Sequence, residues 1–406
     1  MYLTHFALTD FRNFSRLDVD IPRGNILLVG DNAQGKTSLL EAIYFLSTFT
    51  SFHASSDRQV INFIAGKEPL AVGRIVADYK RGGKSHHLEV RIIQESNGIN
   101  GSSRVRKEIL LDGTIRKANE AIGHFNTVLF LPQMLRVVEG SPSERRRYLS
   151  LALSQTIPHH ASALSVYNKA ISQRNALLKL LNERGGDPDQ LSYWDKQVVT
   201  AGAIIIQARI HAIQEIEGLA AMIHHELTRG DEVLRLAYSP AYDPVPQPPG
   251  QFPLLLDTPL NRTNFSTEEI AQGFQKAMIK LRREEIARGQ TTIGPHRDEL
   301  RFLANGVDLG TYGSRGQIRT AMLSLKMAEV AWMKGKTGHW PVLLLDEVLA
   351  ELDPRRRVDL LTRLAESEQT LLTTTDLDLF TAEFVEKASL WHVQAGRVQT
   401  PLTANT

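Results

Sequence analysis

The chain has 406 residues, of which 42% are hydrophobic and 23% charged, as in a globular protein large enough for two or three structural units. It contains no cysteine, which excludes a disulfide scaffold, a cysteine zinc site and a cysteine nucleophile. The formal net charge is only +2, so any binding of nucleic acid must depend on a local cluster of basic residues. No apolar run approaches the roughly 20 residues of a membrane span. The N-terminus lacks the pattern of a signal peptide, so we expect a cytoplasmic protein with no membrane partner.

The first 140 residues alternate between predicted strands and turns around one helix. The apolar run 25–29 is typical of a buried parallel strand, and helical spacing of apolar residues follows over 37–46. Antiparallel strands are predicted at 71–76, 87–93 and 107–111. Their turns are expected at Gly82-Gly83, Asn97-Gly98 and Asp112-Gly113.

A helical region begins at residue 141. Ser141 is suited to the N-cap, Pro142 to the first helical position, and Glu144 completes a capping box. Apolar residues then recur at spacings of three and four as far as about residue 228, in two stripes on either side of the turn-rich stretch 185–188. The first stripe is interrupted by Arg174 and consists of Leu164, Tyr167, Ile171, Leu178 and Leu181. The pattern predicts an antiparallel helical hairpin or a compact helical lobe.

Residues 240–262 are rich in proline, including Pro244, Pro246, Pro248 and Pro249, and are predicted to form a linker or an irregular surface loop. Ser266 and Glu269 predict a capped helix that runs to about Ala287.

Strands and helices alternate again from Thr291, with buried strands at 341–345 and 371–375. We therefore expect an α/β head assembled from both termini, residues 1–140 and 289–406, with a mainly helical lobe inserted at 141–288.

A phosphate-binding motif follows the first apolar run. Residues 30–37 match G-x-x-x-x-G-K-[ST] between a predicted strand and a predicted helix. In such a loop, backbone N–H groups and the helix N-terminus stabilise phosphate oxygens. Lys36 would add charge at the β- and γ-phosphates, and the Thr37 hydroxyl can bind Mg²⁺. The residues expected to contact ATP here are Gly30, Asp31, Asn32, Ala33, Gln34, Gly35, Lys36, Thr37 and Ser38.

Two acids end the second buried strand of the head. Asp346 closes a wholly apolar strand, where a carboxylate has no packing role, and we expect it to hold Mg²⁺ from a strand neighbouring the P-loop strand. Glu347 is then placed to orient or deprotonate the attacking water. The alternative for Glu347 is a plain surface carboxylate.

The segment Ser314-Arg315-Gly316-Gln317 lies upstream of Asp346 and resembles the signature arrangement of ABC ATPases. The hydroxyl of Ser314, the amide of Gly316 and a helix N-terminus, followed by Gln317, can form a second anion site. Within one chain this site and the P-loop cannot meet. In a two-fold pair each signature can cover the other subunit's γ-phosphate, which predicts an ATP-dependent homodimer. The alternative is an ordinary turn with a helix cap.

Several motifs together resemble the RecF family, in family order and over nearly the whole chain. They are Phe11-Arg12-Asn13-Phe14, Gly140-Ser141-Pro142, Arg145-Arg146-Arg147, Gln173-Arg174-Asn175, Gly294-Pro295-His296-Arg297-Asp298, Ser314-Arg315-Gly316-Gln317 and Glu351-Leu352-Asp353. The resemblance implies an ABC-type head in which Arg12 approaches the phosphates and Asp353 crosses the dimer interface. It also implies that Gln133 senses Mg²⁺ and the attacking water. The residues alone leave Arg12 open as a surface charge and Gln133 as ordinary loop polarity.

The resemblance also implies a pathway: binding of duplex or gapped DNA in recombinational repair, with RecR as partner so that RecA can load. ATP hydrolysis would be weak, DNA-stimulated and used as a switch. Arg145, Arg146 and Arg147 are the expected contacts to DNA phosphates, with a second arginine run at 355–357. The alternative is that both runs are solvated helix faces or pair with acids such as Glu144.

Two departures from related patterns help to separate the alternatives. Phe52-His53 stands where the family usually carries an arginine, which leaves a charged nucleotide contact there in doubt. Thr374-Thr375-Asp376 stands where an ABC transporter subunit would carry a switch histidine. An SMC- or Rad50-like ATPase would need hundreds of coiled-coil residues before Ser314 and a Cys-x-x-Cys hook. A non-enzymatic alternative is an ATP-gated binding module in which slow hydrolysis only times release.

Overall fold

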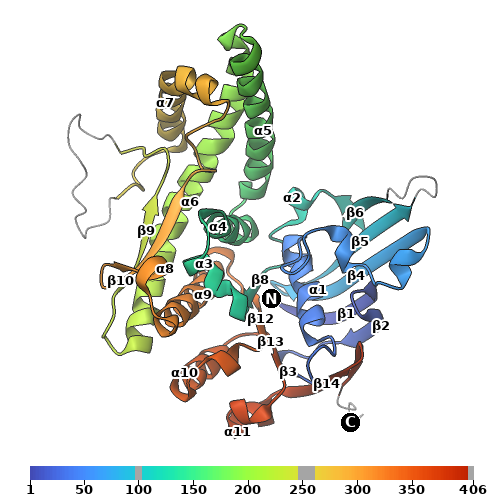
Figure 1. Ribbon diagram of the computed structural model, residues 1–406. Helices are drawn as coiled ribbons and strands as arrows, with labels where there is room; N and C mark the ends of the chain where they lie inside the picture. Colours follow the sequence, from blue (N-terminus) through green and yellow to red (C-terminus); the bar gives the residue numbers. More distant parts are fainter. Residues whose placement is uncertain (97–102, 246–260, 401–406) are drawn as a thin grey trace. The chain divides into compact units, whose positions relative to one another are not determined.

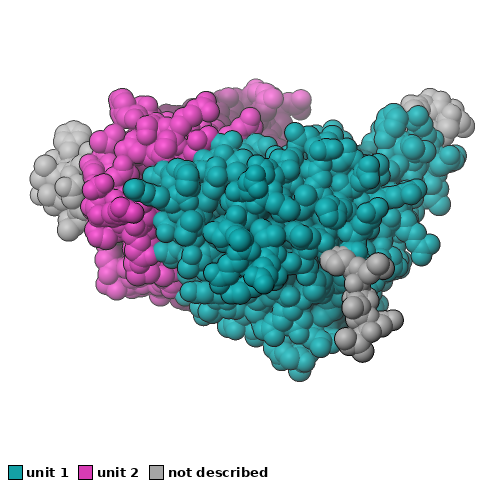
Figure 2. Space-filling view, turned by 90° about the horizontal axis from the view of Figure 1, so that it is seen from below, with its two compact units in different colours: residues 1–134, 329–406 teal, residues 135–328 magenta. Residues whose placement is uncertain are grey.

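A computed structural model describes residues 1–96, 103–245 and 261–400 (Figure 1). The chain forms two compact units, shown in teal and magenta in Figure 2. The first comprises residues 1–134 and 329–406, and the second comprises residues 135–328. Both ends of the chain therefore belong to one unit. Among the described residues, no helix combines the length and apolar character needed to cross a bilayer.

A six-stranded sheet with the order β15-β14-β3-β13-β12-β8 carries the P-loop in the first unit. The five strands from β14 to β8 run parallel, and β15 is antiparallel to β14. Strands of a parallel sheet are usually covered on both faces, which explains their near-continuous apolar runs. Their bounds are β3 (Gly24–Val29), β8 (Thr127–Phe130), β12 (Val342–Asp346), β13 (Gln369–Thr374), β14 (Ser389–Gln394) and β15 (Arg397–Gln399). The three strands predicted at 25–29, 341–345 and 371–375 are confirmed.

An antiparallel sheet with the order β2-β1-β4-β5-β6-β7 completes the first unit. Its strands are β1 (Tyr2–Phe11), β2 (Phe14–Asp20), β4 (Leu70–Arg81), β5 (Lys84–Ser96), β6 (Ser103–Leu111) and β7 (Thr114–Arg116). The predicted strands are confirmed and are longer than expected, with turns at Gly82-Gly83 and Asp112-Gly113. The turn predicted at Asn97-Gly98 lies outside the described residues.

Helix α1 (Lys36–Thr48) shares one hydrophobic core with side chains from both sheets of the first unit, among them Ile75 and Leu344. The remaining helices of this unit are α2 (Ala118–Ala121), α10 (Pro354–Leu364) and α11 (Ala382–Lys387), with 3-10 turns η1 (Asp57–Val60), η2 (Ala65–Lys67), η3 (Pro132–Leu135), η5 (Val348–Glu351) and η6 (Leu377–Leu379).

The second unit is mainly helical, and its long helices α5 and α6 lie side by side with α7 against them (Figure 1). Its helices are α3 (Arg136–Glu139), α4 (Pro142–Thr156), α5 (His160–Arg184), α6 (Ser192–Thr228), α7 (Thr267–Arg288) and α8 (Leu309–Tyr312), with η4 (Pro188–Leu191) between α5 and α6. Helix α9 (Arg315–Thr337) begins in this unit and ends in the first. The predicted hairpin is thus present, and the capping boxes at Ser141 and Ser266 are both formed.

A three-stranded sheet explains why the second unit extends further along the chain than the predicted lobe. Strand β10 (Glu299–Ala304) pairs with β9 (Leu234–Ser239) on one side and with β11 (Val307–Asp308) on the other. Residues 289–328 were expected in the head, but they belong to the second unit, where β10 pairs with β9 and β11. Most of the proline-rich stretch expected as a linker, residues 246–260, lies outside the described residues.

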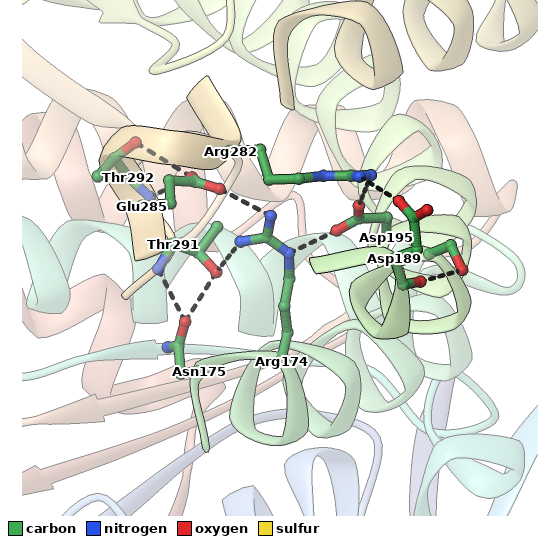
Figure 3. Close-up of polar contacts among 9 residues, drawn as sticks. Arg174, Asn175, Asp189, Asp195, Arg282, Glu285, Thr291 and Thr292 are labelled. Atoms are coloured by element: carbon green, nitrogen blue, oxygen red, sulfur yellow. Dashed lines mark hydrogen bonds and ion pairs between the residues drawn. The ribbon is translucent and has the colours of Figure 1, made fainter. Parts of the chain in front are cut away.

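Arg174 does not merely interrupt an apolar stripe, because it is the centre of a buried ionic cluster (Figure 3). Its side chain is completely buried, and its guanidinium donates to Asp195 Oδ1 and to Thr291 Oγ1, each at 2.7 Å. It also forms an ion pair with Glu285 at 2.7 Å. Arg282 donates to the second oxygen of Asp195 at 3.0 Å. Helices α5, α6 and α7 are therefore tied together by charges that are costly to leave without partners.

The neighbouring residue Asn175 extends this cluster. Its side-chain oxygen accepts hydrogen bonds from the backbone N–H and the hydroxyl of Thr291, at 2.8 and 2.7 Å (Figure 3). The Gln173-Arg174-Asn175 motif thus contributes two side chains to the architecture of the helical unit.

The segment from Gly294 to Asp298 is a second point of internal attachment. Asp298 is buried and accepts hydrogen bonds from Arg209 at 2.8 Å and from the Tyr238 hydroxyl at 2.6 Å. Gly294 has φ +117°, and a Cβ there would lie 2.5 Å from the Tyr167 hydroxyl, so only glycine fits without displacement. This motif therefore has a structural role, holding α5, α6 and β9 in place.

Candidate nucleotide site

The P-loop connects β3 to α1, and its glycines are required by close neighbours. A Cβ on Gly30 would lie 2.3 Å from the carbonyl oxygen of Val393. Gly35 has φ +116°, and a Cβ there would lie 2.5 Å from Asn13 Nδ2. Asn13 also donates to the carbonyl of Gln34 at 3.1 Å. The loop is thus held against the β1–β2 turn and β14, which leaves its amide groups free to face a ligand.

A cavity of 910 Å³ lies over this loop. Its lining brings residues 31–38 of the P-loop together with five other residues named in the sequence analysis: Arg12, His53, Gln133, Asp346 and Glu347. Asn13 and a wall formed by Gln59, Ile61, Asn62, Phe63 and Ile64 complete the lining together with Pro132. A volume of this size suits a nucleotide-sized ligand.

Lys36 lines the cavity and is almost completely buried. Its Nζ donates to the carbonyl oxygens of Gly30 at 2.5 Å and Asp31 at 3.0 Å. The same Nζ lies 3.4 Å from Glu347 Oε1. The ammonium group is therefore fixed beside the loop amides, where it adds a full positive charge to the anion site.

Thr37 and Asp346 meet although β3 and β12 are not neighbours. The Thr37 hydroxyl donates to the two carboxylate oxygens of Asp346 at 2.9 and 3.0 Å. The expectation that Asp346 would stand on a strand neighbouring β3 is wrong, because β13 lies between β3 and β12. Thr373 of β13 donates to Asp346 Oδ1 at 2.8 Å and so orients the carboxylate across the intervening strand.

The donor set at this point suits Mg²⁺. Burial raises the pKa of Asp346, and hydrogen bonds from Thr373 and Thr37 oppose that rise. Within the described part of the chain, no group of three or more His, Cys, Asp or Glu side chains could hold a metal ion. One hydroxyl and one carboxylate, with the remaining ligands from phosphate and water, is the coordination that Mg²⁺ commonly has in nucleotide sites.

Glu347 follows Asp346 in a strained backbone conformation. Its φ is +51°, a left-handed value that is uncommon for a residue with a side chain, and its N–H donates to Thr373 Oγ1 at 2.9 Å. The side chain is 41% exposed, lines the cavity and approaches Lys36. The alternative of a plain surface carboxylate accounts for neither the strain nor the position.

Arg12 is a member of the cavity wall and not a solvated surface charge. Its guanidinium makes two bonds to Glu41, Nε to Oε2 at 2.8 Å and Nη2 to Oε1 at 2.7 Å. Nη1 donates to the carbonyl of Gln59 at 2.9 Å. Glu41 is buried within α1 and also accepts a hydrogen bond from Ser51. Sequence reasoning missed Glu41, although a carboxylate inside the apolar run of a helix was the available signal.

The apolar wall of the cavity was also missed. Phe63 and Ile64 are 77% and 75% exposed, and both line the cavity with the buried Ile61. The ammonium of Lys67 lies 4.5 Å from the centre of the Phe63 ring. Large apolar side chains in a short loop without helical or strand periodicity were the signal that could have found them.

The signature residues lie in the second unit, at the start of α9. Ser314 N donates to Gln317 Oε1 at 2.9 Å, and Gln317 N donates to Ser314 Oγ at 3.2 Å. A Cβ on Gly316 would meet only Ser314 Oγ, at 3.9 Å. Ser314, Arg315 and Gly316 are exposed, so this helix N-terminus is reciprocally capped and faces solvent.

Asp353 caps helix α10. Its carboxylate accepts from the N–H groups of Arg355 and Arg356 at 3.1 and 3.0 Å and from Arg356 Nη1 at 2.7 Å. These bonds, led by the one from the Arg356 N–H, lower the pKa of Asp353. Arg357 of the same run donates to the carbonyls of Leu349 and Leu352.

The three arginines of α4 have different environments. Arg145 is 11% exposed and forms two bonds to Glu299, at 2.7 and 3.1 Å, so its acidic partner is Glu299 and not the suggested Glu144. Arg146 donates to the carbonyl of Asp298 at 2.8 Å. Arg147 is exposed. Of the three, only Arg146 and Arg147 are therefore still expected to contact DNA phosphates.

These features define a P-loop ATPase of the ABC type. They are a P-loop, an Asp-Glu pair at the end of a strand, and a separate exposed signature helix, all carried by an α/β head with a helical insert. The model of the RecF/RecN/SMC N terminal domain matches residues 2–396. The chain belongs to the RecF family. It is 39% identical to the DNA replication and repair protein RecF of Roseiflexus castenholzii and 35% identical to that of Bacillus subtilis, each over 98% of this chain and 99% of the relative.

Solved structures agree with this membership. The recombination mediator protein RecF-ATPrS in RecFOR pathway superposes with a TM-score of 0.81 at 29% identity, covering 98% of both chains. A SmcHead bound to the C-winged helix domain of ScpA has a TM-score of 0.52 at 14% identity, with 99% of this chain and 97% of that one covered, which shows a shared fold.

Proposed function

We propose that the protein is an ATP-dependent DNA-binding ATPase of recombinational repair. ATP would join two copies around duplex or gapped DNA, and slow hydrolysis, stimulated by DNA, would release them. The observation that carries the proposal is the hydrogen bonding of Thr37 to Asp346 inside the cavity over the P-loop. RecF relatives at 39% identity and solved structures of RecF with ATP and ATPrS support it.

The cavity offers each part that hydrolysis needs. The loop amides and Lys36 would hold the phosphates, while Thr37 and Asp346, with Gln133, would hold Mg²⁺. Bound Mg²⁺ would neutralise charge on the β- and γ-phosphate oxygens. Glu347 is the candidate to accept a proton from water, and its carboxylate lies 3.4 Å from Lys36 Nζ, which helps to hold it at the cavity. Arg12, held by Glu41, presents its remaining N–H groups to the nucleotide.

The exposed apolar pair Phe63 and Ile64 is proposed to receive the base of ATP. The P-loop end of the cavity is polar, and Ile61, Phe63 and Ile64 make part of its wall apolar, which matches the two ends of a nucleotide. An exposed aromatic ring that is already beside a cavity loses little freedom when a base stacks on it.

Dimerisation is proposed because the signature is exposed and reciprocally capped, with its helix N-terminus directed at solvent. In a two-fold pair, Ser314, Gly316 and Gln317 would complete the site of the other copy, and Asp353 would lie near the interface. ATP would then be part of the interface, which explains how its hydrolysis could open the dimer.

The contacts to DNA are proposed from charge. Arg146 and Arg147 on α4 are the candidates, whereas Arg145 is occupied by Glu299. Partnership with RecR and loading of RecA are proposed from family membership, since RecF relatives of known structure are described in the RecFOR pathway. Work on chromosomal DNA implies a cytoplasmic protein. A short SMC-like ATPase is the second candidate, supported by the shared head fold.

Light scattering with and without Mg²⁺-ATP and duplex DNA tests the proposal. We expect a monomer without nucleotide, a dimer with ATP and a dimer–DNA complex with both. Ser314→Arg should bind ATP as a monomer and fail to dimerise, because a bulky cation replaces the signature hydroxyl. ATP-dependent dimers of Ser314→Arg would refute the composite site. A wild-type protein whose oligomeric state does not change with ATP would refute the proposed switch.

A further inference from the structure

A chain of polar contacts connects the signature to the end of helix α6. Glu232 lies in the turn between α6 and β9, and its Oε1 accepts a hydrogen bond from Gln317 Nε2 at 2.8 Å. Its other oxygen, Oε2, lies 3.0 Å from Nε2 of His224, which is completely buried in the last turns of α6. One carboxylate therefore bridges α6 and the start of α9.

The same chain reaches α9 at a second point. His224 Nδ1 lies 3.1 Å from Ser324 Oγ, and Ser324 is buried about two turns beyond Gln317 along α9. The first turns of α9 are thus held to α6 at two positions. Buried hydrogen bonds of this kind have strict geometry and are costly to break.

Glu232 also determines how the Gln317 amide faces Ser314. A glutamine amide has a donating end and an accepting end, and a carboxylate can only accept. Because Glu232 takes the donating Nε2, the accepting Oε1 is turned toward Ser314, whose N–H donates to it at 2.9 Å. Gln317 N in turn donates to Ser314 Oγ at 3.2 Å, which fixes the position of the hydroxyl oxygen.

We propose that Glu232 is a positioning residue for the signature. By orienting the Gln317 amide, it presets Ser314 and the first turn of α9 to receive the γ-phosphate of a second copy of this chain. Preorganised donors cost no rearrangement when the phosphate arrives, so dimerisation on ATP gains from this arrangement. The inference rests on the proposed composite site.

The test compares three variants of the full chain in three measurements. Glu232→Ala removes the acceptor. Glu232→Gln keeps it, because its amide oxygen can accept from Gln317 while its NH₂ donates to His224 Nε2. Glu217→Ala is the matched control: Glu217 lies on α6 and, like Glu232, forms an ion pair, but its partner is Arg235 of β9 at 2.6 Å and not a residue of α9. The measurements are thermal melting, ATP binding by dilute monomer, and ATP-dependent dimerisation by light scattering.

We expect Glu232→Ala to melt a few degrees below wild type, because it leaves the buried His224 without this partner. It should bind ATP within about twofold of wild type, since the P-loop is untouched. Its dimerisation should weaken by about tenfold for each signature, hence about a hundredfold for a symmetric dimer with two signatures. Glu232→Gln should dimerise within about threefold of wild type, as should Glu217→Ala. Gln317→Leu removes the other partner of the same hydrogen bond and should show the same dimerisation defect as Glu232→Ala. This variant keeps the inference testable if Glu232→Ala fails to fold.

Wild-type dimerisation by Glu232→Ala would overturn the inference while leaving the composite site standing. Wild-type dimerisation by Gln317→Leu would overturn the inference and would also remove Gln317 from the composite site. A Glu232→Gln variant as defective as Glu232→Ala would also overturn it, because the carboxylate charge and not the orientation of the amide would then matter. A wild-type protein that stays monomeric with ATP would instead refute the proposed function itself.

Discussion

The hydroxyl of Thr37 lies within hydrogen-bond distance of both carboxylate oxygens of Asp346, at 2.9 and 3.0 Å, although the two residues are 309 positions apart. A hydroxyl has one proton to donate, so its oxygen keeps lone pairs that can bind a cation. The two side chains thus already stand where a single Mg²⁺ ion could contact both, at the edge of the cavity that contains Lys36 and Glu347.

Asp346→Asn should abolish the contribution of Mg²⁺ to ATP binding, because an amide oxygen is a poor substitute for a carboxylate as a ligand of this ion. We expect ATP affinity to fall at least about tenfold with Mg²⁺ present and to equal that of wild type in EDTA. A titration with a fluorescent ATP analogue measures both. Equal affinities of variant and wild type in Mg²⁺ would remove Asp346 from the metal site.

Glu347→Gln should slow hydrolysis by about a hundredfold or more while preserving ATP binding, since a carboxamide cannot accept the proton from water. The ATP-bound dimer should accumulate and its complex with duplex DNA should dissociate more slowly. Single-turnover hydrolysis and DNA dissociation rates provide the measurements. If the variant loses DNA binding altogether, hydrolysis is more than a release timer.

Phe63→Ala should weaken ATP binding by about tenfold, because stacking of a base on an aromatic side chain contributes about 1–3 kcal/mol. Inorganic triphosphate has no base, so competition by triphosphate should be unchanged. Phe63 is exposed and lies outside the core, so the variant should fold as wild type does. An equal loss for ATP and triphosphate would mean that Phe63 acts on the phosphate side of the cavity.

Arg146→Ala combined with Arg147→Ala should weaken binding of duplex DNA in a manner that depends on salt. If both side chains contact phosphates, the slope of log affinity against log salt should fall by about 2. Fluorescence anisotropy across a salt series measures the slope. Arg283→Ala with Arg301→Ala, two exposed arginines elsewhere in the same unit, is the control. An unchanged slope for the first pair would exclude α4 from the DNA surface.

The second unit should lose stability between pH 6.5 and pH 4. Burial lowers the pKa of His160 and of His296 to about 4 from an ordinary value of 6.5. As the pH falls through this window the unfolded chain binds protons that the folded chain does not, so the free energy of unfolding decreases. Each histidine should cost on the order of 2 kcal/mol at pH 5. Denaturant unfolding at pH 7 and pH 5 measures the loss, and His160→Gln should reduce it. An identical loss in that variant would contradict the assignment to His160.

Local patterns predicted much of the fold. Buried parallel strands are short apolar runs, and capped helices begin at recognisable residues such as Ser141 and Ser266. The P-loop is predictable because its glycines and lysine are contiguous and stand between a strand and a helix. These features depend on neighbours in the sequence, and a single chain displays them directly.

Long-range partners could not be predicted in the same way. Nothing near Arg174 in the sequence identifies Asp195 and Glu285 as its partners, and Glu232 contacts Gln317, 85 positions away, only because the turn after α6 lies at the start of α9. Likewise, the position of β13 between β3 and β12 is a property of sheet order, which no local pattern encodes. A charged residue that interrupts an apolar stripe indicates that it has a buried partner of opposite charge. The sequence alone does not identify that partner.

The order of the nucleotide sheet has a consequence for synthesis of the chain. Strand β3 lies between β13 and β14, both of which leave the ribosome more than three hundred residues later. At about 5–20 residues per second, the P-loop strand waits roughly 20–70 s for its first neighbour. The helical unit ends at residue 328 and so is synthesised before β13 begins at Gln369, whereas β3 still lacks both of its neighbouring strands at that point. Truncations near the C-terminus should therefore abolish nucleotide binding while leaving the helical unit intact.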